Sequence, residues 1–270
     1  MSAVFSRKRR WGRIDITAGD EFLATSPQVR PWFFHRLLSE TVADLEALDE
    51  MKGSLVAGSG RPLIGGSGWS QAAAEYSAGE LIIAGQQVMQ DWESPLMEAM
   101  ADIAAASHGD VLEVGFGMGI SATMLQQRGV ASHTIIELND EVCARAEQWR
   151  RRYPGHDIRI VHGSWQDVAV SLGTFDAIFY DVYPVTDLEV VKLVQMPFPD
   201  DFFGTAASLL RPGGVFTYYS NEIDSLSRWH QRRLLWHFRR FTVEVVTGLT
   251  PPPDCHYWFA PSMAVVGATS

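Results

Sequence analysis

A glycine-rich turn directly follows an apolar stretch of the chain. Residues 111–114 lead into Gly115, Gly117 and Gly119, and apolar residues at helical spacing follow. Glycines at alternate positions let the backbone approach a ligand where side chains would block it. The order of strand, glycine turn and helix therefore predicts a turn that binds a nucleoside.

An acidic residue ends the next apolar stretch. Glu137 stands about 18 residues beyond Gly119, near the spacing of about 20 at which a carboxylate binds ribose hydroxyls. A dinucleotide fingerprint beginning at Gly115 would need glycine at the position of Ile120, so the pattern favours S-adenosylmethionine over NAD. S-adenosylmethionine has no pyrophosphate, and acidic residues suit its sulfonium and ammonium groups. The alternative is a plain tight turn that binds nothing.

Two further carboxylates could do chemistry near this turn. Asp181 directly follows the apolar stretch 175–180, and α/β proteins bind ligands at the ends of such strands. Glu93 precedes Ser94 and Pro95, where it could be an ordinary carboxylate of a first helical turn. The residues alone favour a functional role for Asp181 and leave that of Glu93 open.

These residues need a scaffold of alternating strands and helices to hold them. Apolar stretches predict strands over residues 110–114, 132–137, 158–161, 175–180 and 214–219. Helical spacing predicts helices over residues 89–107, 119–129, 140–152 and 200–210. Late β-rich segments predict an antiparallel edge pair over residues 241–246 and 256–266. We therefore expect an α/β fold, with a Rossmann-like, doubly wound and mostly parallel sheet.

The first 68 residues differ from the rest of the chain. Helical spacing predicts one or two helices over residues 28–52, and glycines over residues 58–68 indicate a flexible joint. The basic cluster in residues 1–13 is typical of a solvated tail. We expect residues 1–68 to form an N-terminal helical extension, either a lid or the dimerisation element of a homodimer, and residues 69–270 to form the main domain.

Composition excludes several classes of protein. Of the 270 residues, 46% are hydrophobic and 20% are charged, which excludes wholesale disorder and coiled coil. A net charge of −10 repels phosphate backbones, so we expect no nucleic-acid partner. We find no secretory signal and no apolar stretch long enough for a membrane span, which predicts a cytoplasmic protein without membrane contact. Cys143 and Cys255 are too few for a zinc site, so we expect no metal.

Four stretches of the chain carry a resemblance to a known family. They are residues 88–95, 112–118, 180–184 and 252–257. The Phe-Gly-Met of the second stretch and the Tyr-Asp-x-Tyr-Pro of the third are the more specific motifs. From about Trp69 to the C-terminus the chain resembles guanidinoacetate N-methyltransferase, a class I enzyme that depends on S-adenosylmethionine. The resemblance implies methyl transfer to a guanidino nitrogen.

The resemblance also implies the contacts to S-adenosylmethionine. The expected contacts are Trp69, Met89, Met97, Glu113, Gly115, Phe116, Gly117, Met118, Gly119, Ile120, Ser121, Glu137, Leu138, Asn139, Gly163, Ser164 and Trp165. Without the resemblance, Met89 and Met97 would be interpreted as core side chains of a helix. Trp92 and Trp165 have the same alternative interpretation.

The family assigns the two acidic residues to the substrate. By resemblance, Glu93 and Asp181 hold the guanidino group, and Asp181 takes up the proton that leaves it. A guanidinium is planar and presents N–H donors in a fork, so carboxylates in its plane bind it through paired hydrogen bonds. The expected substrate contacts are Glu93, Asp181, Tyr183, Asn221, Glu222 and Ile223.

The chain departs from the family where the substrate carboxylate would bind. Glu222 and Ile223 stand where the family has a Leu-Thr pair, and Glu222 could face solvent or receive an α-ammonium, which guanidinoacetate lacks. We therefore expect methylation of free L-arginine to N-omega-methyl-L-arginine, as in bacterial relatives of antibiotic biosynthesis.

Three alternatives to free L-arginine stay open. The first is guanidinoacetate. The second is arginine in proteins, because fungal protein arginine N-methyltransferases, distant relatives without the Tyr-Asp-x-Tyr-Pro motif, have a similar glycine at the position of Gly119. The third is a protein that binds S-adenosylmethionine without catalysis, in which Glu93 and Asp181 would have no role.

Overall fold

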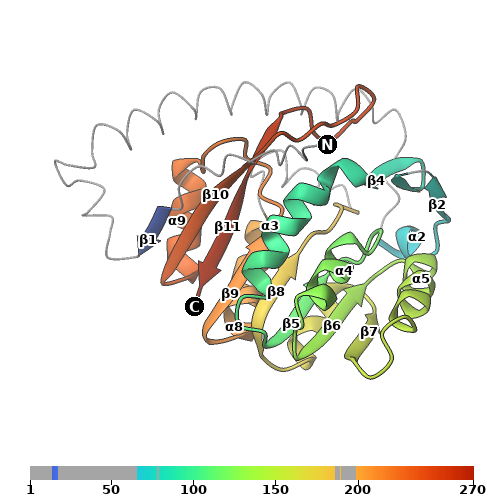
Figure 1. Cartoon of the computed structure of the whole chain (residues 1–270), viewed down its shortest axis with the longest axis horizontal. Helices are drawn as coiled ribbons and strands as arrows, with labels where there is room; N and C mark the ends of the chain where they lie inside the picture. Colours follow the sequence, from blue (N-terminus) through green and yellow to red (C-terminus); the bar gives the residue numbers. More distant parts are fainter. Residues whose placement is uncertain (1–13, 18–65, 78, 186–188, 190–198) are drawn as a thin grey trace, which may run out of the picture.

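The computed structural model describes residues 14–17, 66–77, 79–185, 189 and 199–270. Its centre is an eight-stranded sheet (Figure 1) with the strand order β1, β10, β11, β9, β8, β5, β6, β7. In that order the strands are Ile14–Thr17, Arg240–Thr247, Ser262–Thr269, Leu210–Tyr218, Phe175–Tyr180, Asp110–Val114, Ser132–Glu137 and Asp157–His162. Strands β5 to β9 pair in parallel, and β11, β10 and β1 add antiparallel pairs at one edge. This confirms the expected doubly wound, mostly parallel sheet.

The strand order reverses beside β5. The chain adds β6 and β7 on one side of β5 and then returns to place β8 on the other side, which creates the kind of switch point where α/β folds bind ligands. Gly115 follows β5 and Asp181 follows β8, and the Asp181 N–H donates to the Val114 carbonyl over 3.0 Å. A Cβ atom on Gly115 would lie 2.0 Å from the Asp181 carbonyl oxygen, so only glycine allows the two segments to meet.

Helices cover both faces of the main sheet (Figure 1). They are α3 (Ser94–Ala104), α4 (Ile120–Gln127), α5 (Asp140–Arg150), α6 (Trp165–Val168), α8 (Asp200–Leu209) and α9 (Arg228–His237). One apolar core contains Met100 of α3, Trp149 of α5 and Phe179 of β8. A second core contains Phe202 of α8 and Phe216 of β9. The central strands are thus buried on both faces, as continuous apolar strands of parallel sheets are.

The sequence analysis missed a small antiparallel sheet beside the main one. Strands β2 (Ala74–Ser77), β3 (Glu80–Ile83) and β4 (Gln86–Gln90) form it in chain order. The predicted helix over residues 89–107 is therefore wrong at its start, because a 3₁₀ turn, η2 (Asp91–Glu93), follows β4 and α3 begins only at Ser94. The hydrogen bond from Gln90 N to Glu93 Oε1, 2.8 Å long, stabilises this turn.

Elsewhere the structure corrects and limits the expectations. Residues 14–17, assigned above to the helical extension, form the edge strand β1 by pairing with β10. The two late strands are confirmed as β10 and β11, but residues 256–261 precede β11 in a loop, and Pro261 has no N–H for a strand ladder. The helices predicted over residues 28–52 lie outside the described residues, and the boundary at residue 68 stays a prediction. No described helix is long and apolar enough to cross a membrane.

Candidate active site

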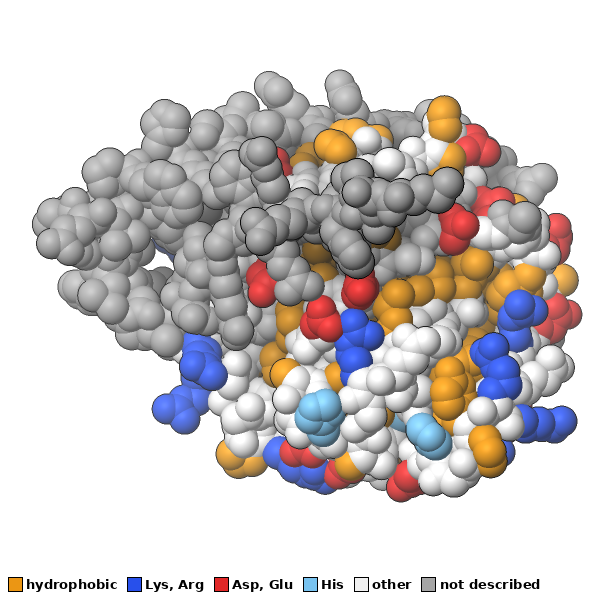
Figure 2. Space-filling view, in the orientation of Figure 1, with side chains coloured by type: hydrophobic (Ala, Val, Ile, Leu, Met, Phe, Trp, Pro, Cys, Tyr) orange, Lys and Arg blue, Asp and Glu red, His pale blue; other side chains and the backbone are white. Residues whose placement is uncertain are grey.

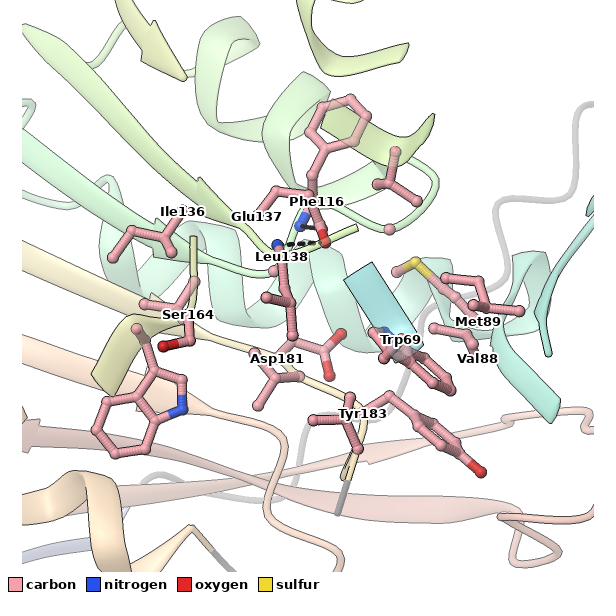
Figure 3. Close-up of a pocket in the computed structure, with 18 of the residues that line it drawn as sticks. Trp69, Val88, Met89, Phe116, Ile136, Glu137, Leu138, Ser164, Asp181 and Tyr183 are labelled. Atoms are coloured by element: carbon pink, nitrogen blue, oxygen red, sulfur yellow. Dashed lines mark hydrogen bonds between the residues drawn. The ribbon is translucent and has the colours of Figure 1, made fainter. Parts of the chain in front are cut away.

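A cavity opens at the carboxyl ends of β5, β6 and β8. About 830 Å³ of empty space lies in it when the open space at its mouth is included. The predicted residues that line it are Trp69, Met89, Gly115, Phe116, Gly117, Ser121, Glu137, Leu138, Gly163, Ser164, Trp165, Asp181 and Tyr183. Figure 3 shows the Asp181 carboxylate pointing toward the side of the cavity where Trp69 and Met89 lie. The structure thus brings most of the expected residues together.

The Glu137 carboxylate is fixed at the end of β6 by backbone donors. It accepts hydrogen bonds from the N–H groups of Phe116 (3.0 Å), Leu138 (2.7 Å) and Asn139 (2.8 Å), of which Figure 3 draws those between labelled residues. Burial raises the pKa of Glu137, and these hydrogen bonds oppose that rise. The acid therefore ties the glycine turn to the end of β6 while it lines the cavity.

Trp69 enters the cavity wall through a contact made by Asn139. Asn139 is fully buried, and its side-chain amide donates to the carbonyl groups of Trp69 (2.9 Å) and Ala72 (2.8 Å). The Trp69 ring in turn stacks on Tyr183, with ring centroids 5.2 Å apart and planes 3° from parallel. Asn139 was expected to contact the cofactor, but its side chain holds the end of α2 (Gly66–Ser70) and the residues just after it.

Other expected cofactor contacts do not line the cavity. Met97 lies in the apolar core. The Glu113 carboxylate is fully buried, bonds to the Ser121 hydroxyl and pairs with His133 Nε2 at 2.8 Å. These two expectations are corrected by position, because both side chains are enclosed by protein atoms.

Three more expected residues line a groove outside the cavity. Met118, Gly119 and Ile120 line an open groove between α4 and α5, together with Arg145 and Trp149. Figure 2 shows hydrophobic side chains bordered by Lys or Arg side chains on the face over these helices. Neighbouring residues of a helix point in different directions, so Ser121 lines the cavity while Ile120 does not.

Asp181 and Glu93 lie within electrostatic reach of each other although they are far apart in the sequence. The Asp181 carboxylate lines the cavity and has no hydrogen-bond or ion-pair partner among the described residues. The Glu93 side chain is 2% exposed, and its Oε1 accepts from Gln90 N (2.8 Å) and from the Tyr257 hydroxyl (2.6 Å). Its Oε2 has no partner among the described residues, so one oxygen of Glu93 and both oxygens of Asp181 lack a protein partner, although only Asp181 lines the cavity.

The two carboxyl groups have strongly raised pKa values. Burial raises the pKa of Glu93 to about 8, the Asp181 charge adds to this, and hydrogen bonds from Tyr257 and Gln90 oppose it. Burial also raises the pKa of Asp181 to about 7, and the Glu113 charge adds to it. Among the described residues no lysine or arginine pairs with either group. The arrangement favours a bound cation, because a positive charge would let both groups ionise.

Two aromatic residues of the site were not predicted. Tyr257 comes from the loop between β10 and β11, donates to Glu93 and stacks on Trp92 at 5.9 Å. Tyr219 directly follows β9, where the charges of Glu93 and Asp181 contribute to a raised pKa. The segment 252–257 was part of the resemblance, but nothing in its sequence indicates a contact to Glu93. The sequence gives no signal for Tyr219.

The structure corrects the expected role of Glu222. This side chain is 1% exposed and neither faces solvent nor lines the cavity. Its Oε1 lies 3.0 Å from His230 Nδ1, and its Oε2 accepts from Ser227 N over 2.6 Å. Glu222 therefore anchors the start of α9 and has no free oxygen for an α-ammonium.

The other expected substrate contacts are only partly in place. Tyr183 lines the cavity, and its hydroxyl lies 3.4 Å from Gln86 Oε1. Asn221 adopts a left-handed backbone conformation with φ of 55°. Ile223 packs against the apolar core that contains Met100, and neither Asn221 nor Ile223 lines the cavity.

Solved structures of other proteins share the fold of this chain. A spermidine synthase in complex with the transition state analogue AdoDATO aligns with a TM-score of 0.53 and 16% identity, over 73% of this chain and 72% of that chain. The spermidine synthase of Thermotoga maritima aligns with a TM-score of 0.50 and 15% identity, over 73% and 71%. These likenesses show that the chain shares their Rossmann-like fold.

Sequence comparison identifies the family to which the chain belongs. The family model of guanidinoacetate N-methyltransferase matches residues 65–234, and the chain belongs to this family. It is also similar to fungal proteins named protein arginine N-methyltransferase 2. Identity is 33% with that of Yarrowia lipolytica, over 49% of this chain and 28% of the relative, and 32% with that of Eremothecium gossypii, over 56% and 37%. The chain thus spans about a third of the length of these relatives.

The cavity fits S-adenosylmethionine, the cofactor of this family. The glycine turn lets Met89 of the cavity wall pack directly against the backbone, since a Cβ atom on Gly117 would lie 2.8 Å from Met89 Sδ. Glu137 stands at the end of β6, where an acidic side chain binds ribose hydroxyls in such folds. Leu138 and Val142 add apolar wall beside it.

We predict that removing one carboxylate stabilises the empty protein at alkaline pH. The unfolded chain releases the protons of Glu93 and Asp181 near pH 4, whereas the folded protein keeps them until about pH 7 to 8. The free energy of unfolding therefore falls as pH rises from about 4 to about 8. Asp181→Asn should therefore raise the free energy of unfolding at pH 8 by roughly 1–3 kcal/mol. Urea denaturation at pH 5 and pH 8 measures this.

The exposed Asp157 on β7 supplies the matched control. Asp157→Asn removes one negative charge far from the cavity. If both variants changed stability equally, the overall charge of the protein, and not the buried acidic pair, would explain the result.

Proposed function

We propose that this protein transfers a methyl group from S-adenosylmethionine to a terminal guanidino nitrogen, with free L-arginine as the substrate. The observation that carries the reaction type is the buried pair of Glu93 and Asp181, which lacks a counter-cation among the described residues. Membership in the guanidinoacetate N-methyltransferase family supports the same chemistry. The likeness to fungal proteins named arginine N-methyltransferases supports arginine as the group that carries the guanidino nitrogen.

The two carboxylates can orient a guanidinium. Its N–H donors lie in one plane, and each carboxylate with free oxygens accepts them in that plane. Asp181 offers both oxygens, whereas Glu93 offers Oε2 because Oε1 is already bonded to Gln90 and Tyr257. Glu93 thus anchors the cation, and Asp181 borders the cavity where the cofactor binds.

S-adenosylmethionine supplies a methyl group on a sulfonium for in-line displacement. Attack by the guanidino nitrogen forms the new N–C bond as the S–C bond breaks, and one proton must then leave that nitrogen. An aspartate of ordinary pKa near 4 lies about 9 units below a guanidinium, so taking the proton before methyl transfer would cost roughly 12 kcal/mol. Asp181 therefore accepts the proton during or just after methyl transfer.

Fewer observations support L-arginine as the substrate than support methyl transfer to a guanidino nitrogen. Glu222 was the reason to expect an α-ammonium, and it is occupied by His230 and Ser227. The second candidate is guanidinoacetate, which the family description favours. The third is arginine in proteins, which the names of the fungal relatives favour. A cytoplasmic location, a homodimer and a role in antibiotic biosynthesis stay predictions from the sequence.

Separate substitutions should divide the roles of the two acids. Asp181→Asn keeps the shape of the side chain but cannot take up a proton, so we expect kcat to fall by about 10²–10⁴-fold. Glu93→Gln should chiefly raise KM for the guanidino substrate, because it removes the charge that anchors the cation. Asp91→Asn, on the same turn as Glu93 but exposed, is the control. Turnover of Asp181→Asn near that of the unaltered protein would refute the role of a general base.

Turnover on three compounds ranks the substrates. Labelled S-adenosylmethionine is incubated with L-arginine, guanidinoacetate or a peptide that contains arginine, and methyl incorporation is measured at matched concentrations. We expect the highest kcat/KM for L-arginine. A preference for guanidinoacetate or for the peptide would overturn the choice of substrate, and no transfer to any of them would overturn the reaction type.

A further inference from the structure

Tyr219 stands at the edge of the sheet where the acidic pair lies. It directly follows β9, its N–H donates to the Tyr180 carbonyl over 3.2 Å, and Asp181 is the next residue after Tyr180. Its backbone also bridges to Val265 of β11. The backbone of Tyr219 is therefore fixed on both sides, beside the segment that carries the Asp181 carboxylate.

The Tyr219 hydroxyl is buried and lacks a hydrogen bond. Its oxygen is shielded from solvent and has no partner among the described residues. The tyrosines around it differ in this respect. The Tyr257 hydroxyl donates to Glu93 over 2.6 Å, and the Tyr218 hydroxyl is bonded to His230 Nε2. An unbonded hydroxyl in the interior is costly to the folded protein, so its presence calls for a partner that arrives from outside.

The charges of both acids affect the pKa of this hydroxyl. Burial is the main cause of the raised pKa of Tyr219, and the charges of Glu93 and Asp181 raise it further. The hydroxyl therefore stays protonated near neutral pH and lies within electrostatic reach of both carboxylates. A neutral O–H group can donate its hydrogen and can also accept a hydrogen bond from a ligand.

A bound guanidinium would have N–H donors that the two acids leave without an acceptor. A guanidinium with one substituent has five N–H donors, and the three free carboxylate oxygens described above do not exhaust them. A neutral acceptor suits the remaining donors, because the two ionised carboxylates already outweigh the charge of the bound cation and a third carboxylate would add further negative charge.

We propose that the Tyr219 hydroxyl is a third substrate-binding group, which accepts an N–H hydrogen bond from the guanidinium held by Glu93 and Asp181. This inference rests on the proposed function and adds a specificity-determining residue to it. The bond satisfies the buried hydroxyl only when substrate is present. Tyr219 thus favours a guanidinium over a cation without spare N–H donors, such as a quaternary ammonium.

Tyr219→Phe removes only the hydroxyl and tests the inference. We expect KM for the best guanidino substrate to rise about 10- to 100-fold, the range for a hydrogen bond to a charged group. The affinity for S-adenosylmethionine, measured by titration calorimetry, should stay unchanged. The melting temperature of the protein without substrate should be equal to or higher than that of the unaltered protein, because the lost hydroxyl had no partner.

Tyr218→Phe is the matched control, one residue earlier on the same strand. Its hydroxyl is bonded to His230, so this variant should lower the melting temperature and affect KM less. A Tyr219→Phe variant with unchanged KM, or with a lowered melting temperature like that of Tyr218→Phe, would overturn the inference and leave the proposed function standing. An unaltered protein that neither binds nor methylates any guanidino compound would overturn both.

Discussion

The candidate site depends on the burial of two carboxylates without a cation to pair with them. Glu93 and Asp181 are enclosed together, and among the described residues no basic side chain pairs with them, so the pKa values of the two groups rise to about 8 and about 7. Such a pair destabilises the empty protein above neutral pH and is relieved by a bound cation. Affinity for a flat cation and strain in its absence therefore have the same physical origin.

The fold creates this pair by joining segments that are far apart in the chain. The switch point beside β5 places Asp181 against the glycine turn. Any side chain at position 115 would clash with the Asp181 carbonyl oxygen. A hydrogen bond from Gln90 N holds Glu93 at the end of the small sheet, and Tyr257 reaches it from the opposite end of the chain. One backbone contact thus fixes the glycine turn, which suits the cofactor, next to Asp181, which suits the substrate.

The sequence predicts those features whose signals are local. Apolar stretches and the glycines located β5, β6 and β8 to the residue, because buried parallel strands need continuous apolar side chains. The small sheet was missed, since the apolar residues around Val88 and Met89 have helical spacing, while pairing with β3 decides their structure. Long-range partners are not visible in a sequence. For that reason Glu222 was expected to bind substrate although it bonds to His230, and Tyr219 and Tyr257 were not assigned to the site at all.

Proton release on binding tests the central claim most directly. Titration calorimetry of L-arginine or guanidinoacetate into the protein with S-adenosylhomocysteine, in two buffers of different ionisation enthalpy, counts the protons released. If the two acids hold protons in the empty site and lose them to a bound cation, binding near pH 7 should release about one proton, and the release should vanish above about pH 9. Binding of the same strength with no proton release near pH 7 would contradict the account.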